Sequence, residues 1–231
     1  MSESIREAFT LLFQLDPAVL GIVLTSLEVS LSALVIGTLL GIPLGAVLAT
    51  EQFPGKQIAI VIVNSLMGVP TVIVGVLVYL LLSRSGPFGE WGWLFTVQGM
   101  MVAQSLLTIP LIAALSRQVL EDAWRIHRET FLILRLPTLA RIKWLIWDCR
   151  FSLSIAILAG FARAISEVGA VMIVGGNIDR YTRTMTTAIA LETSKGDLPL
   201  ALSLGIVLLG IVLIANLMMY WIRQTAERRY G

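Results

Sequence analysis

The sequence predicts an all-α integral membrane protein with five spanning helices, as indicated by its composition, its long charge-free runs and its lack of strand-like alternation. Of the 231 residues, 57% are hydrophobic and 14% are charged, whereas about 25% of a soluble domain is charged. Membrane barrels show short segments of alternating hydrophobicity, which this chain lacks. Because lipid offers no partner to unpaired backbone groups, we expect the spans to be helices.

The five spans follow from runs with few or no charged side chains. A hydrocarbon core of about 30 Å takes roughly 20 helical residues to cross. We predict crossings at 17–50, 58–83, 95–117, 151–174 and 198–222, within a single transmembrane domain that covers residues 1–231. Apolar residues of the segment 5–13 recur at helical spacing, which indicates a short helix on the membrane surface or a plain lead-in to the first span.

The basic residues outside the spans predict the orientation. With the N-terminus outside, eleven of the 17 lysines and arginines lie inside, five lie outside and Arg163 falls within a span. Cytoplasmic loops carry the excess of basic residues in membrane proteins. We therefore expect the N-terminus outside and the C-terminus in the cytoplasm, in agreement with an odd number of crossings.

Covalent chemistry is not indicated. The single cysteine, Cys149, excludes an internal disulfide and a multi-thiolate metal site. The single histidine, His127, lies among basic residues and has no nucleophile to serve. Phosphate-binding and hydrolase motifs are missing from the sequence, so we predict no catalytic residue, no metal ligand and no nucleic-acid binding. The basic segment 117–150 is too long for a simple connection and favours either a cytoplasmic protein partner or anionic lipid.

Three blocks of the sequence carry a resemblance to a known family. They are LTSLEVSLSALVIGTLLGIPLGAVLA in the first span, FARAISEVGAVMIVGGNI in the fourth, and TRTMTTAIALETSKGDLPLAL after it. The chain resembles the permease subunits of ATP-binding-cassette (ABC) importers, in the oxyanion branch of molybdate, sulfate and tungstate permeases. The last two blocks look most like tungstate permeases.

The resemblance implies a fold, a function and partners. The fold is the type I, molybdate/sulfate-permease-like arrangement. The function is translocation of tungstate across the cytoplasmic (inner) membrane of a prokaryote, as a homodimer that receives substrate from an extracytoplasmic tungstate-binding protein. Two copies of a separate ATPase subunit bind ATP and Mg, so the chain itself needs no cofactor. Molybdate or sulfate import is the alternative within the family. A secondary transporter or a membrane enzyme is the alternative outside it, although neither repeated halves nor clustered catalytic groups appear in the sequence.

In this family a short cytoplasmic coupling helix with a Glu-Ala-Ala…Gly signature inserts into the ATPase. One register of the signature begins at Glu129 and places Arg135 at the glycine; the other begins at Glu121 and places His127 there. We expect the helix over about 124–136, ended by Pro137 because proline is poorly tolerated inside a helix. The candidate coupling residues are Glu121, Arg128, Glu129, Thr130 and Arg135.

Two charges inside the fourth span need an explanation. Arg163 and Glu167 are four residues apart, so in a continuous helix they share a face and can pair. Unpaired charges are costly at mid-membrane, and the pair is predicted to face other helices or a wet cavity. A structural or gating ion pair and direct contact with the permeating oxyanion are the two alternatives. The candidate route or gate residues are Arg163, Ser166, Glu167, Thr71 and Ser65, and Pro70 is expected to kink the second span.

The polar segment after the fourth span is predicted to lie outside. By resemblance it belongs where the binding protein docks, and Asp179, Arg180 and Arg183 are the candidate contacts. A plain solvated loop is the alternative. Thr184, Thr186 and Thr187 are candidates for a helix that returns toward the route.

Overall fold

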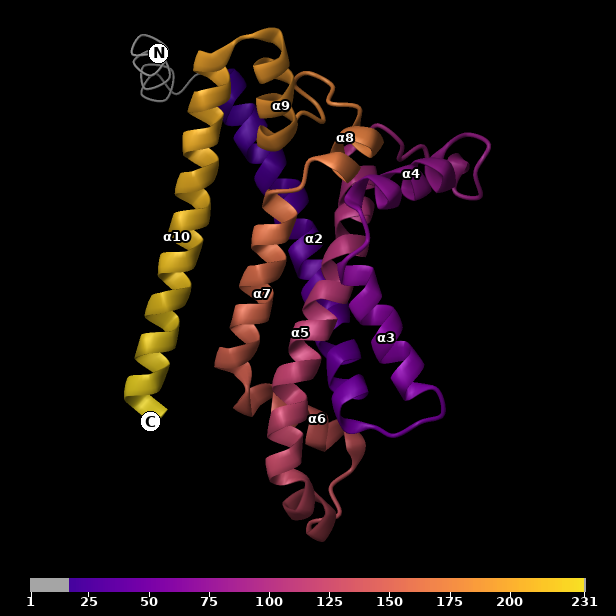
Figure 1. Cartoon of the computed structure of the whole chain (residues 1–231), viewed down its shortest axis with the longest axis vertical. Helices are drawn as coiled ribbons and strands as arrows, with labels where there is room; N and C mark the ends of the chain where they lie inside the picture. Colours follow the sequence, from indigo (N-terminus) through magenta and orange to yellow (C-terminus); the bar gives the residue numbers. More distant parts are fainter. Residues whose placement is uncertain (1–16, 231) are drawn as a thin grey trace. The chain divides into compact units, whose positions relative to one another are not determined.

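The structure is a computed structural model that describes residues 17–230, and these residues form helices and connecting turns without a β-strand (Figure 1). The helix predicted within 5–13 lies outside the described residues. The elements are α2 (Pro17–Thr50), α3 (Lys56–Met67), α4 (Thr71–Leu82), the 3₁₀ turn η1 (Gly89–Trp91), α5 (Val97–Ile133), α6 (Thr138–Asp148), α7 (Arg150–Ile165), α8 (Gly169–Gly175), α9 (Met185–Lys195) and α10 (Leu198–Tyr230).

The chain divides into two compact units. The first comprises Met1–Ala33, Pro70–Gln104 and Ala162–Ala215, and the second comprises Leu34–Val69, Ser105–Phe161 and Asn216–Gly231. Helices α2, α5, α7 and α10 each supply residues to both units. The described helices thus contribute to two packing units, and the single transmembrane domain stays a prediction.

In the first unit, α4 packs closely on α8. A Cβ built on Gly75 of α4 would lie 2.8 Å from the Cα of Ala170 in α8, closer than side-chain carbons approach. Small residues allow membrane helices this kind of close packing. Val29, Met100 and Val171 form a buried apolar cluster in the same unit.

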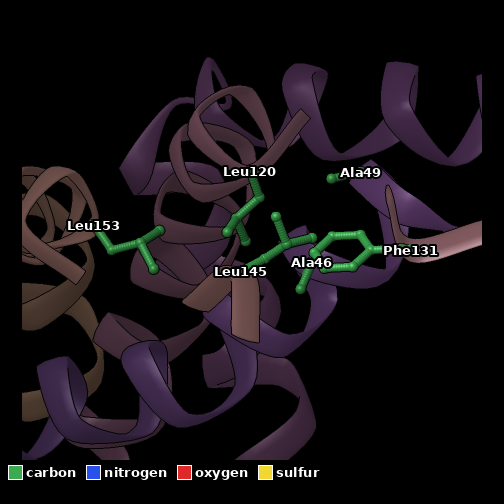
Figure 2. Close-up of a cluster of buried hydrophobic side chains, with 6 residues drawn as sticks. All are labelled: Ala46, Ala49, Leu120, Phe131, Leu145 and Leu153. Carbon is green, nitrogen blue, oxygen red and sulfur yellow. The ribbon is translucent and has the colours of Figure 1, made fainter. Parts of the chain in front are cut away.

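In the second unit, α2, α5, α6 and α7 contribute side chains to one apolar core (Figure 2). The buried side chains are Ala46, Ala49, Leu120, Phe131, Leu145 and Leu153. Trp144 packs edge-on against Phe131 with ring centroids 5.3 Å apart. Full burial of a leucine or phenylalanine from water contributes about 1.5–3 kcal/mol, so this core holds α6 against the end of α5.

Three helices among the described residues are long and apolar enough to cross a membrane alone: Val19–Thr50, Val97–Ile133 and Leu198–Trp221. Two bent helix pairs raise the number to five if each pair is one span: α3 with α4, bent by 100°, and α6 with α7, bent by 78°. The all-helical membrane fold predicted from the sequence is confirmed, with three to five candidate spans.

The helices differ from the predicted spans where the chain breaks or continues. The predicted span 58–83 breaks between Met67 and Thr71, and Pro70 directly precedes α4. The predicted span 151–174 is also discontinuous, because α7 ends at Ile165 and α8 starts at Gly169. In contrast, the predicted span 95–117 continues without interruption to Ile133. The expected kink at Pro70 is thus a complete break.

Candidate functional site

Glu167 lies in the break between α7 and α8 and is 6% exposed. Its Oε1 accepts a hydrogen bond of 3.1 Å from the backbone N–H of Ala170, and its carbonyl oxygen accepts one of 2.7 Å from Thr186 Oγ1. The predicted ion pair with Arg163 is wrong, since none joins these two described residues. The physical reason is the end of α7 at Ile165, which removes the shared helix face.

The other predicted route residues have different surroundings. Arg163 and Ser166 are exposed, near the end of α7. Thr71, at the start of α4, lies against the start of α8, because a Cβ on Gly169 would be 3.0 Å from Thr71 Oγ1. The first unit thus contains all four of Arg163, Ser166, Glu167 and Thr71. Ser65 belongs to the second unit, where it is exposed on α3.

The three residues predicted to contact a binding protein line one cavity of about 540 Å³ in the first unit. Its lining consists of Pro17, Gly21, Ile22, Thr25, Asp179, Arg180, Tyr181 and Arg183. Arg183 pairs with Asp179 at 3.0 Å, while its buried Nε has no hydrogen-bond partner among the described residues. Arg180 is exposed and has a left-handed φ of 57°. The sequence therefore identified the residues of the 179–183 segment that line this cavity, but not the residues of α2 that line its other side.

A buried acid that the sequence analysis missed supports this cavity. Glu192 of α9 is 5% exposed and lies 4.0 Å from Arg183 and 3.0 Å from Lys195. The spacing of three residues between Glu192 and Lys195 was the available signal, since such residues are neighbours on a helix. Glu192 therefore helps Asp179 to fix the orientation of the Arg183 side chain.

A threonine-rich network anchors the start of α9. Thr184 caps the helix, and its hydroxyl and that of Thr187 form a reciprocal capping box. Ser26 of α2 accepts a hydrogen bond of 2.7 Å from the backbone N–H of Met185. The predicted helix is present as α9, with Thr184 as its N-cap, and its return toward the route stays a prediction. Ser26 could not be found from the sequence, because it is 159 positions away from its partner.

The predicted coupling residues lie on the last turns of α5, in the second unit. Glu121 forms ion pairs with Arg117 and Arg125, each one helical turn away. By contrast, Arg128, Glu129 and Thr130 are exposed, and neither Arg128 nor Glu129 forms an ion pair with a described residue. Both carboxylate oxygens of Glu121 therefore form ion pairs within α5. The side chains of Arg128, Glu129 and Thr130 are accessible to another protein.

Arg135 ends α5 in a left-handed conformation with a φ of 49°. The backbone N–H of Arg135 donates to Leu132 O at 3.2 Å, and that of Leu136 donates to Phe131 O at 3.2 Å. These two bonds form the Schellman motif, in which glycine usually holds the left-handed position. Pro137 then precedes α6. The predicted end of the helix before Pro137 is confirmed, although the helix is the end of α5 and not a separate short one.

A second cavity, of about 500 Å³, opens beside these residues in the second unit. It is lined by Ala49, Thr50, Glu51, Gln52, Lys56, Glu121, Trp124, Arg125, Arg128, Leu132 and Arg141. Arg141 pairs with Glu51 at 3.3 Å and lies over the ring of Trp124. Four cations and two carboxylates give this cavity an excess of positive charge.

Large apolar side chains are also exposed around the end of α5. Ile126 is 75% exposed and Ile133 is 81% exposed, and Leu132, Leu134 and Leu139 are exposed as well. Contiguous apolar exposure next to a charged cavity is typical of a protein-interaction surface.

Within the described part of the chain, no group of three or more histidine, cysteine or acidic residues is placed to hold a metal ion.

Three long apolar helices and two bent helix pairs among the described residues define a multi-pass helical membrane protein. The tungstate uptake system permease protein TupB of Peptoclostridium acidaminophilum is 39% identical to the chain over 97% of it and 98% of the relative. The TupB protein of Campylobacter jejuni is 35% identical over 96% and 93%. A probable anion ABC transporter permease protein of Haloferax volcanii is 35% identical over 89% and 91%. No protein-family model matches the chain.

The chain belongs to the family of ABC transporter permeases that includes the tungstate uptake permeases. The family predicted from the sequence is thereby confirmed.

Proposed function

We propose that this chain is the permease subunit of an ABC importer that carries tungstate across the cytoplasmic membrane of a prokaryote. The observation that carries the proposal is its similarity, over nearly the full length of both chains, to two permeases of tungstate uptake systems, at 39% and 35% identity. A third relative is named only for an anion, which agrees with the charge of the substrate.

The complete importer contains two copies of this chain, two ATPase subunits and a tungstate-binding protein outside the membrane. Alternating access needs two halves that move against one another, and this chain has no repeated halves, so a second copy supplies the other half. ATP and Mg belong to the ATPase subunits. This chain supplies the route and the contacts at either end of it, with its N-terminus outside and its C-terminus in the cytoplasm.

The exposed end of α5 is the surface for the ATPase. The left-handed backbone at Arg135 supports the register that begins at Glu129, because glycine adopts that conformation at least cost. In the rival register the glycine position falls on His127, within the continuous helix α5. Exposed Arg128, Glu129 and Thr130 then lie on the contact surface, and Glu121 maintains the helix.

Substitution of Glu129 or Arg128 is expected to reduce the coupling of transport to ATP hydrolysis. We expect the variants Glu129→Ala and Arg128→Ala to lower tungstate uptake per ATP hydrolysed by about tenfold, the effect of losing a charged contact of about 1.4 kcal/mol. The matched control is Asp122→Ala, an exposed acid on the same helix outside the second cavity. Unchanged coupling in both variants would remove this surface from the proposal.

The cavity beside Arg180 and Arg183 supports the contact with the binding protein. Its volume of about 540 Å³ exceeds the size of one oxyanion and accommodates an acidic side chain of a protein partner. Because Asp179 and Glu192 hold Arg183, Arg180 is the cation left for a partner. Charges at the rim of an interface chiefly accelerate encounter.

The test is deletion of this chain in its native host, followed by measurement of cell-associated tungsten, molybdenum and sulfur after brief exposure to low concentrations of the three oxyanions. A loss of tungsten uptake alone, restored by the wild-type chain, supports the proposal. A loss of molybdenum or sulfur uptake would retain the importer and change the substrate. Unchanged uptake of all three would contradict an oxyanion importer and leave a secondary transporter or a membrane enzyme.

A further inference from the structure

Among the residues that the structure describes, none supplies a counter-charge to Arg163, which lies near the end of α7. Its side chain is exposed and forms no ion pair or hydrogen bond with another described residue. The acid expected to neutralise it, Glu167, is buried and accepts a hydrogen bond from the backbone N–H of Ala170. The positive charge of Arg163 therefore remains available to a ligand.

The depth of Arg163 along α7 makes this charge significant. Arg163 follows Arg150, the first residue of α7, by 13 residues, which is about 20 Å along a helix. A hydrocarbon core is about 30 Å thick. The crossing predicted at 151–174 and the predicted orientation place Arg150 at the cytoplasmic boundary, and Arg163 then lies about two thirds of the way across. Arginine at such depth is rarely directed toward lipid and usually faces a water-filled cavity or another protein group.

Ser166 lies on the same side of the chain as Arg163. The backbone N–H of Ser166 still bonds to Ala162 O at 3.3 Å, so the helical turn continues to this residue. Positions three apart are neighbours on a helical turn, and both side chains are exposed, whereas Ala164 and Ile165 between them are buried. A guanidinium and a hydroxyl are therefore presented together.

We propose that Arg163 and Ser166 form a transit site for a tetrahedral oxyanion dianion within the importer. This inference rests on the proposed function and identifies the residues that select for negative charge. The planar guanidinium supplies charge and paired N–H donors to the oxygens of the anion, and the Ser166 hydroxyl donates another hydrogen bond. One cation against a dianion attracts without full neutralisation, which permits both entry and release.

Glu167 has a positioning role in this arrangement. A continuous helix from 150 to 174 would bring Glu167 to the face of Arg163 and neutralise it. The break at 166–168 instead holds the carboxylate against the start of α8, and Thr186 Oγ1 bonds to the Glu167 carbonyl oxygen at 2.7 Å. The break thus keeps the acid away from the anion.

The experiment uses the purified importer, with its ATPase and binding protein, in liposomes supplied with ATP and tungstate. We expect Arg163→Gln to lower the initial rate of tungstate uptake at least tenfold, and Arg163→Lys to retain a larger part of the rate because it keeps the charge. Ser166→Ala is expected to lower the rate severalfold. The control is Arg84→Gln, an exposed arginine in the same unit outside both cavities, which should transport like the wild type.

The outcomes separate this inference from its alternatives. An Arg163→Gln importer that transports like the wild type would overturn the transit site. Loss of uptake together with loss of the permease dimer, seen by native mass spectrometry, would assign the charge to the contact between two copies and also overturn it. Loss of uptake by an intact complex is the expected result.

An error in the proposed substrate would give a different result, which is seen in the uptake by the wild-type importer. If the wild-type importer accumulates molybdate and not tungstate, the substrate in the proposed function is wrong. The ratio of Arg163→Gln to wild-type uptake, measured with molybdate, then decides the transit site. A wild-type importer that accumulates none of the three oxyanions overturns both proposals.

Discussion

At the scale of single residues, the position of the Glu167 carboxylate decides whether Arg163 is part of an ion pair. The sequence pattern Arg163-x-x-x-Glu167 favours a pair only if the helix continues, and the pattern itself does not show whether it does. The break at 166–168 depends on contacts with α4 and α9, which are distant in sequence. The burial of Glu167 could for this reason not be predicted from sequence patterns, and the functional role of the two charges stays a prediction.

Two substitutions of Glu167 distinguish the effect of its hydrogen bond from the Ala170 N–H from the effect of its negative charge on stability. Glu167→Gln retains an oxygen acceptor, so we expect it to melt within about 2 °C of the wild type in detergent. Glu167→Ala leaves a buried N–H unsatisfied at a cost of about 1–3 kcal/mol, which lowers the melting temperature by about 2–4 °C per kcal/mol in a chain of this size. Equal melting of Glu167→Ala and the wild type would contradict the capping role.

Arg135 holds a backbone conformation that favours glycine. A left-handed φ costs a side-chain-bearing residue about 1 kcal/mol, so we expect Arg135→Gly to raise the melting temperature by about 2–4 °C. Leu134, the preceding residue, has no positive φ, and Leu134→Gly should lower the melting temperature because glycine gains freedom in the unfolded chain. A decrease for Arg135→Gly would show that its side chain stabilises the protein by more than the backbone strain.

At the scale of elements, Pro70 was informative about a helix break, whereas the first charged residues after an apolar run did not mark the end of a helix. Pro70 predicted a disturbance of the second span, and the structure has a 100° bend there. The predicted end of the third span near 117 was based on the appearance of charged residues. Charged residues favour water over lipid, but they do not end a helix. The sequence between Arg117 and Ile133 contains no helix-breaking residue, so α5 continues to Ile133.

The contact between α4 and α8 gives a prediction for one glycine. Gly75→Ala places a Cβ 2.8 Å from the Cα of Ala170, and this neighbour is a backbone atom that has little room to move. We expect Gly75→Ala to lower the melting temperature by several degrees, in line with the cost of overpacking of about 1–3 kcal/mol. Gly210→Ala on α10 is the control, because its Cβ would meet nothing within 4 Å. Equal tolerance of both variants would show that α4 can move away from α8.

At the scale of the whole molecule, composition predicted the all-helical membrane fold and resemblance predicted the family. The division into two units was not predictable, since it arises from long-range packing along helices that the sequence presents as uniform spans. The number of crossings follows from how the bent pairs are counted: three if α2, α5 and α10 alone cross, and five if both pairs cross as well.

Labelling of single cysteines distinguishes these two topologies. In a Cys149→Ser background, cysteines replace four exposed residues, one in each connection between predicted spans: Gln52, Ser85, Leu139 and Ser194. With five crossings and the N-terminus outside, a membrane-impermeant maleimide labels positions 85 and 194 on intact spheroplasts, and labels 52 and 139 only after lysis. With three crossings, 52 and 85 share one side and 139 and 194 share the other. Labelling of both 85 and 194, with 52 and 139 protected until lysis, therefore requires that both bent pairs cross. The difference between 52 and 85 reports on α3 with α4, and the difference between 139 and 194 reports on α6 with α7.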